Sequence, residues 1–191
     1  MAIAKDFVFF GRLCLDFAQT GDMGYGSQFE RLTSTAELQR WLRLSPLGLA
    51  KLRINAEDLK GARLLRSAIW RVTSAVVAST HADAGDVRML NEMACQPGLV
   101  KELDSKTKLS RWHSPSIAQA LATIAQDAVV LLGDPSCRAR LRRCENARCK
   151  AVFYDDSRPG LRRWCAPNRC GDRIRARLYR TRQKSRRIGG R

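Results

Sequence analysis

Four cysteines near the end of the chain form two equally spaced pairs, and this spacing constrains the fold more than any other feature. Cys144 and Cys149 form one C-x4-C pair, and after fifteen intervening residues Cys165 and Cys170 form a second. Two short-range pairs separated by a hairpin-sized gap are the arrangement of a tetrahedral four-thiolate zinc site. Because four thiolates close the coordination shell, the predicted cofactor is one structural Zn²⁺ ion and not a catalytic metal.

Two other uses of these cysteines are weighed against zinc. Disulfides would require an oxidising compartment, and the sequence shows no export signal. An iron–sulfur cluster also takes four thiolates, but its usual spacings crowd three cysteines closely together. We favour zinc and keep both as alternatives. Cys14, Cys95 and Cys137 are interpreted as small buried hydrophobic residues, and His81 and His113 are given no ligand role.

The positive charge of the chain is concentrated in the same region as the paired cysteines. The 191 residues hold 35 Lys and Arg against 18 Asp and Glu, a net charge of +17. Residues 1–137 carry only +2, whereas residues 138–191 carry +15, with 17 arginines among 19 basic residues. Such a segment indicates a polyanionic partner, either nucleic acid or an anionic membrane surface. The arginine fork matches phosphates and guanine edges, which favours nucleic acid; a solvated basic tail is the alternative.

The order of residues in this module predicts a treble-clef-like finger. After the first cysteine pair we expect a strand over 150–154, a turn over 155–160, a returning strand over 161–164 and a helix over 170–184. On that helix Ile174, Leu178 and Thr181 form a thin apolar line, expected to pack against Phe153 and Trp164. Basic side chains recur along the opposite face, where phosphates are the expected ligand. The candidate nucleic-acid contacts of the finger and helix are Arg158, Arg162, Arg163, Arg173, Arg175, Arg177, Arg180, Arg182 and Lys184.

The first 134 residues are predicted to form an α+β, mostly helical domain. Gly133-Asp134-Pro135 ends its last helix, which places two domains at residues 1–134 and 138–191. Polar residues at Ser34, Asn55 and Ser116 stand before apolar periodic segments and predict helix starts. The expected elements are a strand over 6–10, a short helix within 11–20, helices over 35–42, 55–79, 86–94 and 116–132, and a hairpin of 99–103 with 108–112.

Three charged residues are candidates for a ligand site in this domain. Asp16 lies within an apolar block, where a buried carboxylate is conceivable beside its role as a structural hydrogen-bond acceptor. Arg12 and Arg31 are candidates for recognising an anion, with pairing to Asp16 and Glu30 as the alternative. The sequence shows no nucleophile–base pair and no paired carboxylates, so we do not expect an enzyme.

A longer set of residues resembles a known family. The finger resembles the CGNR zinc finger, whose tetrapeptide begins at the fourth zinc ligand; here it reads Cys170-Gly171-Asp172-Arg173, with Asp172 where the family has Asn. The first part resembles the ABATE domain that usually accompanies it. The matching residues are Cys144, Cys149, Phe153, Asp156 to Cys165 and Cys170 to Arg173 in the finger, and Gly11 to Phe17, Glu30 to Leu32, Leu38, Trp41 and Leu42 before it. The resemblance implies a stress-induced bacterial transcription regulator that binds DNA.

We therefore expect a DNA-binding transcription regulator located in the cytoplasm. Its N-terminal domain would sense a small-molecule effector or form a homodimer. The alternatives are an RNA-binding or ribosome-associated zinc protein and a protein-interaction adaptor. No uncharged apolar run is long enough to span a membrane, and the first residues are too charged for a signal peptide.

Overall fold

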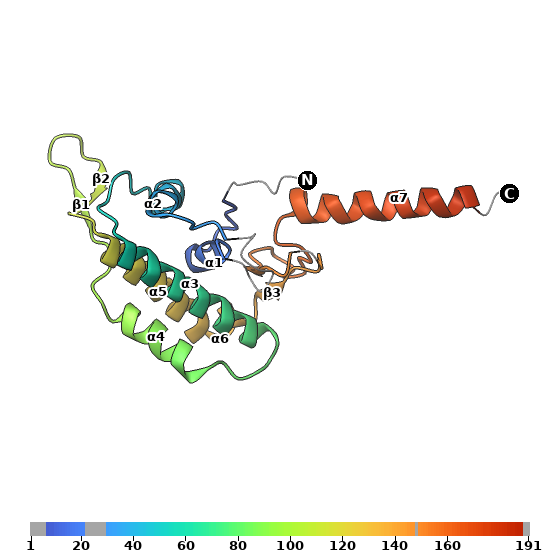
Figure 1. The fold of residues 1–191 in the computed structure, drawn as a ribbon, viewed down its shortest axis with the longest axis horizontal. Helices are drawn as coiled ribbons and strands as arrows, with labels where there is room; N and C mark the ends of the chain where they lie inside the picture. Colours follow the sequence, from blue (N-terminus) through green and yellow to red (C-terminus); the bar gives the residue numbers. More distant parts are fainter. Residues whose placement is uncertain (1–6, 22–29, 148, 189–191) are drawn as a thin grey trace.

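The protein folds into a helical domain joined to a small cysteine-containing finger and a long C-terminal helix (Figure 1). The computed structural model describes residues 7–21, 30–147 and 149–188. This arrangement confirms the predicted fold class. The helices of the first part are α1 (Leu13–Ala18), α2 (Thr35–Leu44), α3 (Ala56–Val77), α4 (Ala84–Ala94), α5 (Ile117–Gly133) and the short α6 (Pro135–Arg138).

Local sequence signals set where these helices begin. The Asn55 side chain accepts a hydrogen bond from the Asp58 N–H, and the Asp58 carboxylate accepts one from the Asn55 N–H, which completes a capping box at the start of α3. Ser116 and Gln119 form the same reciprocal pair at the start of α5. Ser34 caps α2 by accepting from the Glu37 N–H. Each cap satisfies main-chain donors that a helix start would otherwise leave without partners.

The core lies where α1, α3 and α5 meet, with α4 packed against α3 and α5. The rings of Phe17 on α1 and Trp41 on α2 are fully buried, with centroids 4.8 Å apart. Ile69 on α3 and Ile124 on α5 fill the same core. Strands β1 (Lys101–Leu103) and β2 (Ser110–Trp112) pair antiparallel, as predicted, in a hairpin at one end of the domain (Figure 1).

The strand predicted over residues 6–10 is wrong for the described residues 7–10, which lie in irregular backbone. Within the described residues, this segment pairs with neither sheet, and it is held by its side chains. The Phe9 ring stacks near Trp41, with centroids 6.2 Å apart, and the Phe10 N–H donates to Asp16. Phe7 packs on the core of the helical domain, whereas Phe10 packs on the cysteine cluster, so this segment contacts both parts of the molecule.

A small hairpin joins the finger to the helical domain. Strand β3 (Leu141–Arg143) pairs antiparallel with β4 (Val152–Tyr154). Leu141 and Val152 belong to the core of the helical domain, and the Gln19 side chain donates to the Val152 carbonyl at 2.9 Å. The finger is therefore anchored against α1 and α3.

This hairpin corrects the prediction that residues 161–164 form the partner strand. The segment between Cys144 and Cys149 reverses the chain, so the strands on either side of it pair with each other. Residues 161–164 are not a strand. The Arg162 N–H donates to the Asp155 carboxylate at 2.8 Å and the Arg163 carbonyl accepts from the Glu145 N–H at 3.0 Å, so these groups make single contacts in place of a ladder.

The last elements are a π-helical turn, η2 (Pro167–Gly171), and the helix α7 (Asp172–Ile188), close to the predicted helix over 170–184. Helix α7 extends away from the rest of the molecule (Figure 1), and η2 is the element it packs against most. Of the predicted apolar line, Ile174 is half-buried; the side chains of Leu178 and Thr181 lie outside the described part of the structure. Within the part of the chain that the structure describes, no helix has the length and apolar character to cross a membrane.

Candidate metal centre and nucleic-acid surface

The structure brings the four predicted ligands together. The sulfur atoms of Cys144, Cys149, Cys165 and Cys170 all lie within 4.8 Å of one another. The Sγ atoms of Cys149 and Cys165 are 3.5 Å apart, and those of Cys165 and Cys170 are 3.7 Å apart. A tetrahedron with zinc–sulfur bonds of about 2.3 Å has edges of about 3.8 Å. The cluster therefore has the size of one four-coordinate Zn²⁺ ion, and the chain has a site for one structural zinc.

The alternatives to zinc fit this geometry less well. All seven cysteines are free thiols, so the paired disulfides considered from the sequence are not formed. The sulfur separations enclose a single ion, whereas an iron–sulfur cluster would have to place several metal and sulfide atoms between the same thiolates.

The electrostatics of the cluster also call for a cation. Hydrogen bonds from the other three cysteines lower the pKa of Cys144. The Cys144 sulfur raises the pKa of Cys149, and that of Cys165 is raised by Cys144, Cys149 and Cys170. Four thiolates at this spacing repel one another, and a divalent cation at their centre removes that repulsion.

Local main-chain geometry positions the ligands in their two pairs. The Cys149 N–H donates to the Asn146 carbonyl at 2.7 Å, and the Cys144 N–H donates to the Ala151 carbonyl at 2.8 Å. These bonds close the tight turn between the first two ligands. In the second pair, the Cys170 N–H donates to the Ala166 carbonyl at 2.8 Å, which places the fourth ligand inside η2.

Aromatic residues pack around the cysteines and connect them to α7. Phe10, Phe153 and Trp164 surround the cluster and shield it from water. A Cβ atom on Gly171 would lie 3.4 Å from the Trp164 ring and 3.2 Å from the Arg175 guanidinium. A small side chain here would touch the tryptophan ring at ordinary van der Waals distance and would need only a small shift of the flexible Arg175 guanidinium.

The three remaining cysteines differ in their surroundings. Cys14 is fully buried, as predicted, and burial raises the pKa of its thiol. Cys137 is half-buried and lies 3.5 Å from the Asp134 carboxylate. The prediction of a buried Cys95 is wrong: Cys95 is the C-cap residue of α4 and is exposed.

Ion pairs divide the arginines of the finger into two groups. All four acidic residues of the segment 138–191 have basic partners or hydrogen-bond donors within the finger. Glu145 pairs with Arg163, with 2.7 Å from the arginine Nε to the carboxylate. Asp156 pairs with Arg162 at 2.6 Å, and Asp172 pairs with Arg175.

Asp155 is the fourth of these acids and is buried. Although burial acts to raise its pKa, hydrogen bonds from Ser157 and from the Arg162 N–H lower it. The Arg162 guanidinium also donates to the Cys165 carbonyl at 2.9 Å and lies 5.2 Å from the centroid of the Phe153 ring. Arg162, half-buried, thus holds the turn after β4 against the cysteine cluster.

The structure leaves other predicted contact residues on the surface. Arg173, Arg177 and Arg180 are exposed and follow one another at i, i+4 and i+7, so they share one face of α7. Arg158 is exposed on the turn after β4. The side chains of Arg182 and Lys184, which were also predicted, lie outside the described part of the structure.

The candidate ligand residues of the helical domain do not converge on one site. Arg12 pairs with Asp127 on α5, with 3.0 Å between Nε and the carboxylate, and not with Asp16. The Asp16 carboxylate is buried and accepts the Phe10 N–H at 2.5 Å. Burial raises its pKa to about 7, against the lowering effect of the main-chain hydrogen bonds from Phe10 and Gly11. For Arg31 the described contact is made by its main-chain N–H, which donates to the Thr20 carbonyl.

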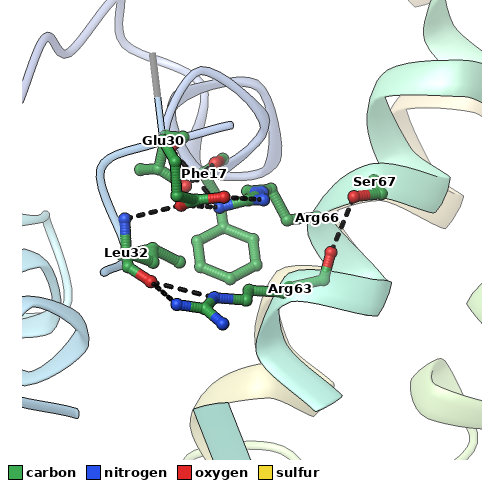
Figure 2. Close-up of polar contacts among 7 residues, drawn as sticks. Phe17, Glu30, Leu32, Arg63, Arg66 and Ser67 are labelled. Atoms are coloured by element: carbon green, nitrogen blue, oxygen red, sulfur yellow. Dashed lines mark hydrogen bonds and ion pairs between the residues drawn. The ribbon is translucent and has the colours of Figure 1, made fainter. Parts of the chain in front are cut away.

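Glu30 is held by an arginine that the sequence interpretation missed. The Arg66 guanidinium on α3 donates to both carboxylate oxygens of Glu30, at 2.6 and 2.7 Å (Figure 2). Next to it, Arg63 donates from Nε and Nη2 to the Leu32 carbonyl, at 2.9 and 2.6 Å (Figure 2). These contacts fasten the segment around residues 30–32 to α3. They point to a structural role for the Glu-Arg-Leu run of this segment.

The fold and the metal centre together define a helical domain that carries a four-cysteine zinc finger. Comparison with family models identifies each part. Residues 11–135 match ABATE, described as "Putative stress-induced transcription regulator", and residues 140–183 match the CGNR zinc finger. The chain belongs to the ABATE family and carries a CGNR zinc finger. Among curated proteins, no sequence matches the chain.

Proposed function

We propose that this protein is a DNA-binding transcription regulator and that its zinc finger presents α7 to the DNA backbone. The observation that carries the proposal is the combination of a zinc-held anchor with a protruding helix rich in exposed arginines. The description of the matched family as a transcription regulator supports the same conclusion.

The charge of α7 is difficult to explain without an anionic partner. Arg173, Arg177 and Arg180 lie within one or two helical turns of one another, and like charges at this spacing destabilise an isolated helix. Little packing offsets that repulsion, because α7 leaves the body of the protein after its first turn (Figure 1). Phosphates beside the helix would neutralise the arginines and release counterions from the DNA.

The dimensions of α7 suit a groove of duplex DNA. Its 17 residues make a helix of about 25 Å at 1.5 Å per residue. The major groove is wide enough to admit an α-helix, with arginines on phosphates and a smaller number on base edges. Asp172 fits this arrangement because its carboxylate is matched by Arg175 on the same helix.

The test is a titration of a labelled mixed-sequence duplex, followed by fluorescence anisotropy at several salt concentrations. The double variant R173Q/R180Q is compared with wild type and with R88Q, which removes one exposed positive charge from α4. If each α7 arginine contacts one phosphate, the double variant lowers the salt slope by about 1.8, at about 0.9 per contact. R88Q is expected to leave the slope unchanged. An unchanged slope in the double variant would overturn the proposed surface.

Competition with structured RNA separates DNA binding from the main alternative. An RNA-binding protein would be displaced from duplex DNA by RNA at lower concentration than by unlabelled DNA. A protein-interaction adaptor would show no salt-dependent binding to either nucleic acid. We further propose a non-enzymatic, cytoplasmic role in which the helical domain senses an effector or forms a homodimer.

A further inference from the structure

Two arginines that precede the first zinc ligand are fixed in place by main-chain carbonyls and have no carboxylate partner among the described residues. Arg140 donates from Nη1 to the main-chain carbonyls of Asp155 and Ser157, at 3.0 Å each. Arg142 donates to the Ala139 carbonyl at 2.8 Å and to the Gly160 carbonyl at 3.3 Å. Both guanidinium groups are therefore hydrogen-bonded to the turn that follows β4.

The two carboxylates of the turn after β4 already have other hydrogen-bond or ion-pair partners. Asp155 accepts from Ser157 and from the Arg162 N–H, and Asp156 pairs with Arg162. Across the described residues, neither Arg140 nor Arg142 forms an ion pair with an acid. Their contacts with neutral carbonyls orient the guanidinium groups but leave both positive charges without a counter-charge.

A third arginine stands on the same turn. Arg158 is exposed, and within the described part of the chain its side chain has no hydrogen bond or ion pair. Arg140 and Arg142 contact the carbonyls on either side of it, at Ser157 and Gly160. The topology thus gathers three unneutralised arginines around one short turn of the zinc finger.

Such a cluster has the properties of a phosphate site. A half-buried cation without a counter-charge is unfavourable, and an anion beside it relieves that penalty. The guanidinium fork binds phosphate oxygens bidentately. Because Arg140 and Arg142 are held by main-chain hydrogen bonds, they lose little conformational freedom when a phosphate binds.

We propose that Arg140, Arg142 and Arg158 form a second phosphate-contacting surface of the finger, separate from α7. This inference rests on the proposed function and deepens it, because the same DNA duplex would contact the finger at two separate surfaces. The helix supplies the arginines of its exposed face, and the turn after β4 supplies a rigid clamp on the backbone.

The experiment uses full-length, zinc-loaded protein and the same labelled duplex over the same range of salt. R158Q removes a charge that makes no contact within the described structure, so it tests the surface without disturbing the fold. R140Q/R142Q removes the other two charges, and R140K/R142K restores them without the guanidinium fork. R88Q on α4 is the matched control, and zinc content and thermal unfolding confirm that each variant is folded.

The expected result is a salt slope lowered by about 0.9 in R158Q and by about 1.8 in R140Q/R142Q. The lysine variant should recover the slope but bind more weakly than wild type, because lysine makes no bidentate contact. If R173Q/R180Q lowers the slope while R158Q and R140Q/R142Q behave like R88Q, the second surface is overturned and α7 binding stands. If wild type shows no salt-dependent binding, both proposals are overturned.

Discussion

Replacing Glu30 by Gln removes the negative partner of Arg66 and leaves a buried positive charge without compensation. The Arg66 side chain is only 7% exposed and that of Glu30 is 21% exposed, and their nearest charged atoms are 2.6 Å apart. Removing one partner from a buried ion pair costs about 3–5 kcal/mol. We take the lower end, about 3 kcal/mol, because the carboxylate is partly accessible to water.

The assay is thermal unfolding of the zinc-loaded chain, followed by circular dichroism. For a chain of this size each kcal/mol lowers the melting temperature by roughly 2–4 °C, so E30Q should melt about 6–12 °C below wild type. E57Q is the control, because Glu57 forms an exposed i,i+3 pair with Lys60 and should change little. Removing both charges, in E30Q/R66M, should recover part of the loss.

The same pair has a pH signature with a definite sign. Although burial acts to raise it, the hydrogen bonds from Arg66 lower the pKa of Glu30 below its ordinary value of 4.5. The stabilisation is therefore complete above about pH 4.5 and is lost as the pH falls through the lowered pKa. E30Q should lack this loss on acidification. If the melting temperature of E30Q is as close to that of wild type as the melting temperature of E57Q is, the structural role assigned to Glu30 is refuted.

Three further outcomes follow from the structure. Chelation of zinc should lower the unfolding temperature of the whole chain in one transition, seen by calorimetry, because Leu141 and Val152 of the finger lie in the main core; separate transitions would argue against a shared core. C170S should abolish stoichiometric zinc binding, measured by metal analysis, whereas C137S should retain it. Asp16 is more protonated in the folded state, where burial raises its pKa from 3.8 to about 7, so its contribution to stability should decline between about pH 4 and 7; D16N should flatten that part of the profile of melting temperature against pH.

Features with local causes were predictable from the sequence. The spacing of Cys144, Cys149, Cys165 and Cys170 was sufficient to predict one metal site, because each pair lies on a single tight turn. Helix starts were equally local, since a capping side chain bonds to the main chain three residues away, as Asn55 does with Asp58.

Features that depend on distant pairing were not predictable in the same way. Glu30 is neutralised by Arg66, 36 residues further on, and Arg12 contacts residue 127, 115 residues away. Neither partner stands out in the sequence, because many arginines and aspartates were available. For residues 152–154 the sequence pattern predicted the later segment 161–164 as partner, whereas the chain reversal at the first cysteine pair brings residues 141–143 beside them.

Ion pairing was a third property that the sequence pattern did not determine. Arg162, Arg163 and Arg173 look alike as residues of a basic finger. In the structure Arg162 and Arg163 are paired with acids, whereas Arg173 on α7 has no ion pair with any described acid. Within the part of the chain that the structure describes, the exposed acids of the finger pair with Arg162, Arg163 and Arg175 and leave Arg158 on the turn after β4 without an acidic partner.

The measurement that tests the central claim most directly is the salt dependence of duplex binding by wild-type protein carrying one zinc per chain. The logarithm of the association constant, measured by anisotropy, should fall linearly with the logarithm of the salt concentration, with a slope that reports several phosphate contacts. Unlabelled duplex DNA should also compete better than structured RNA. Zinc-loaded protein that binds no duplex even at low salt would contradict the account.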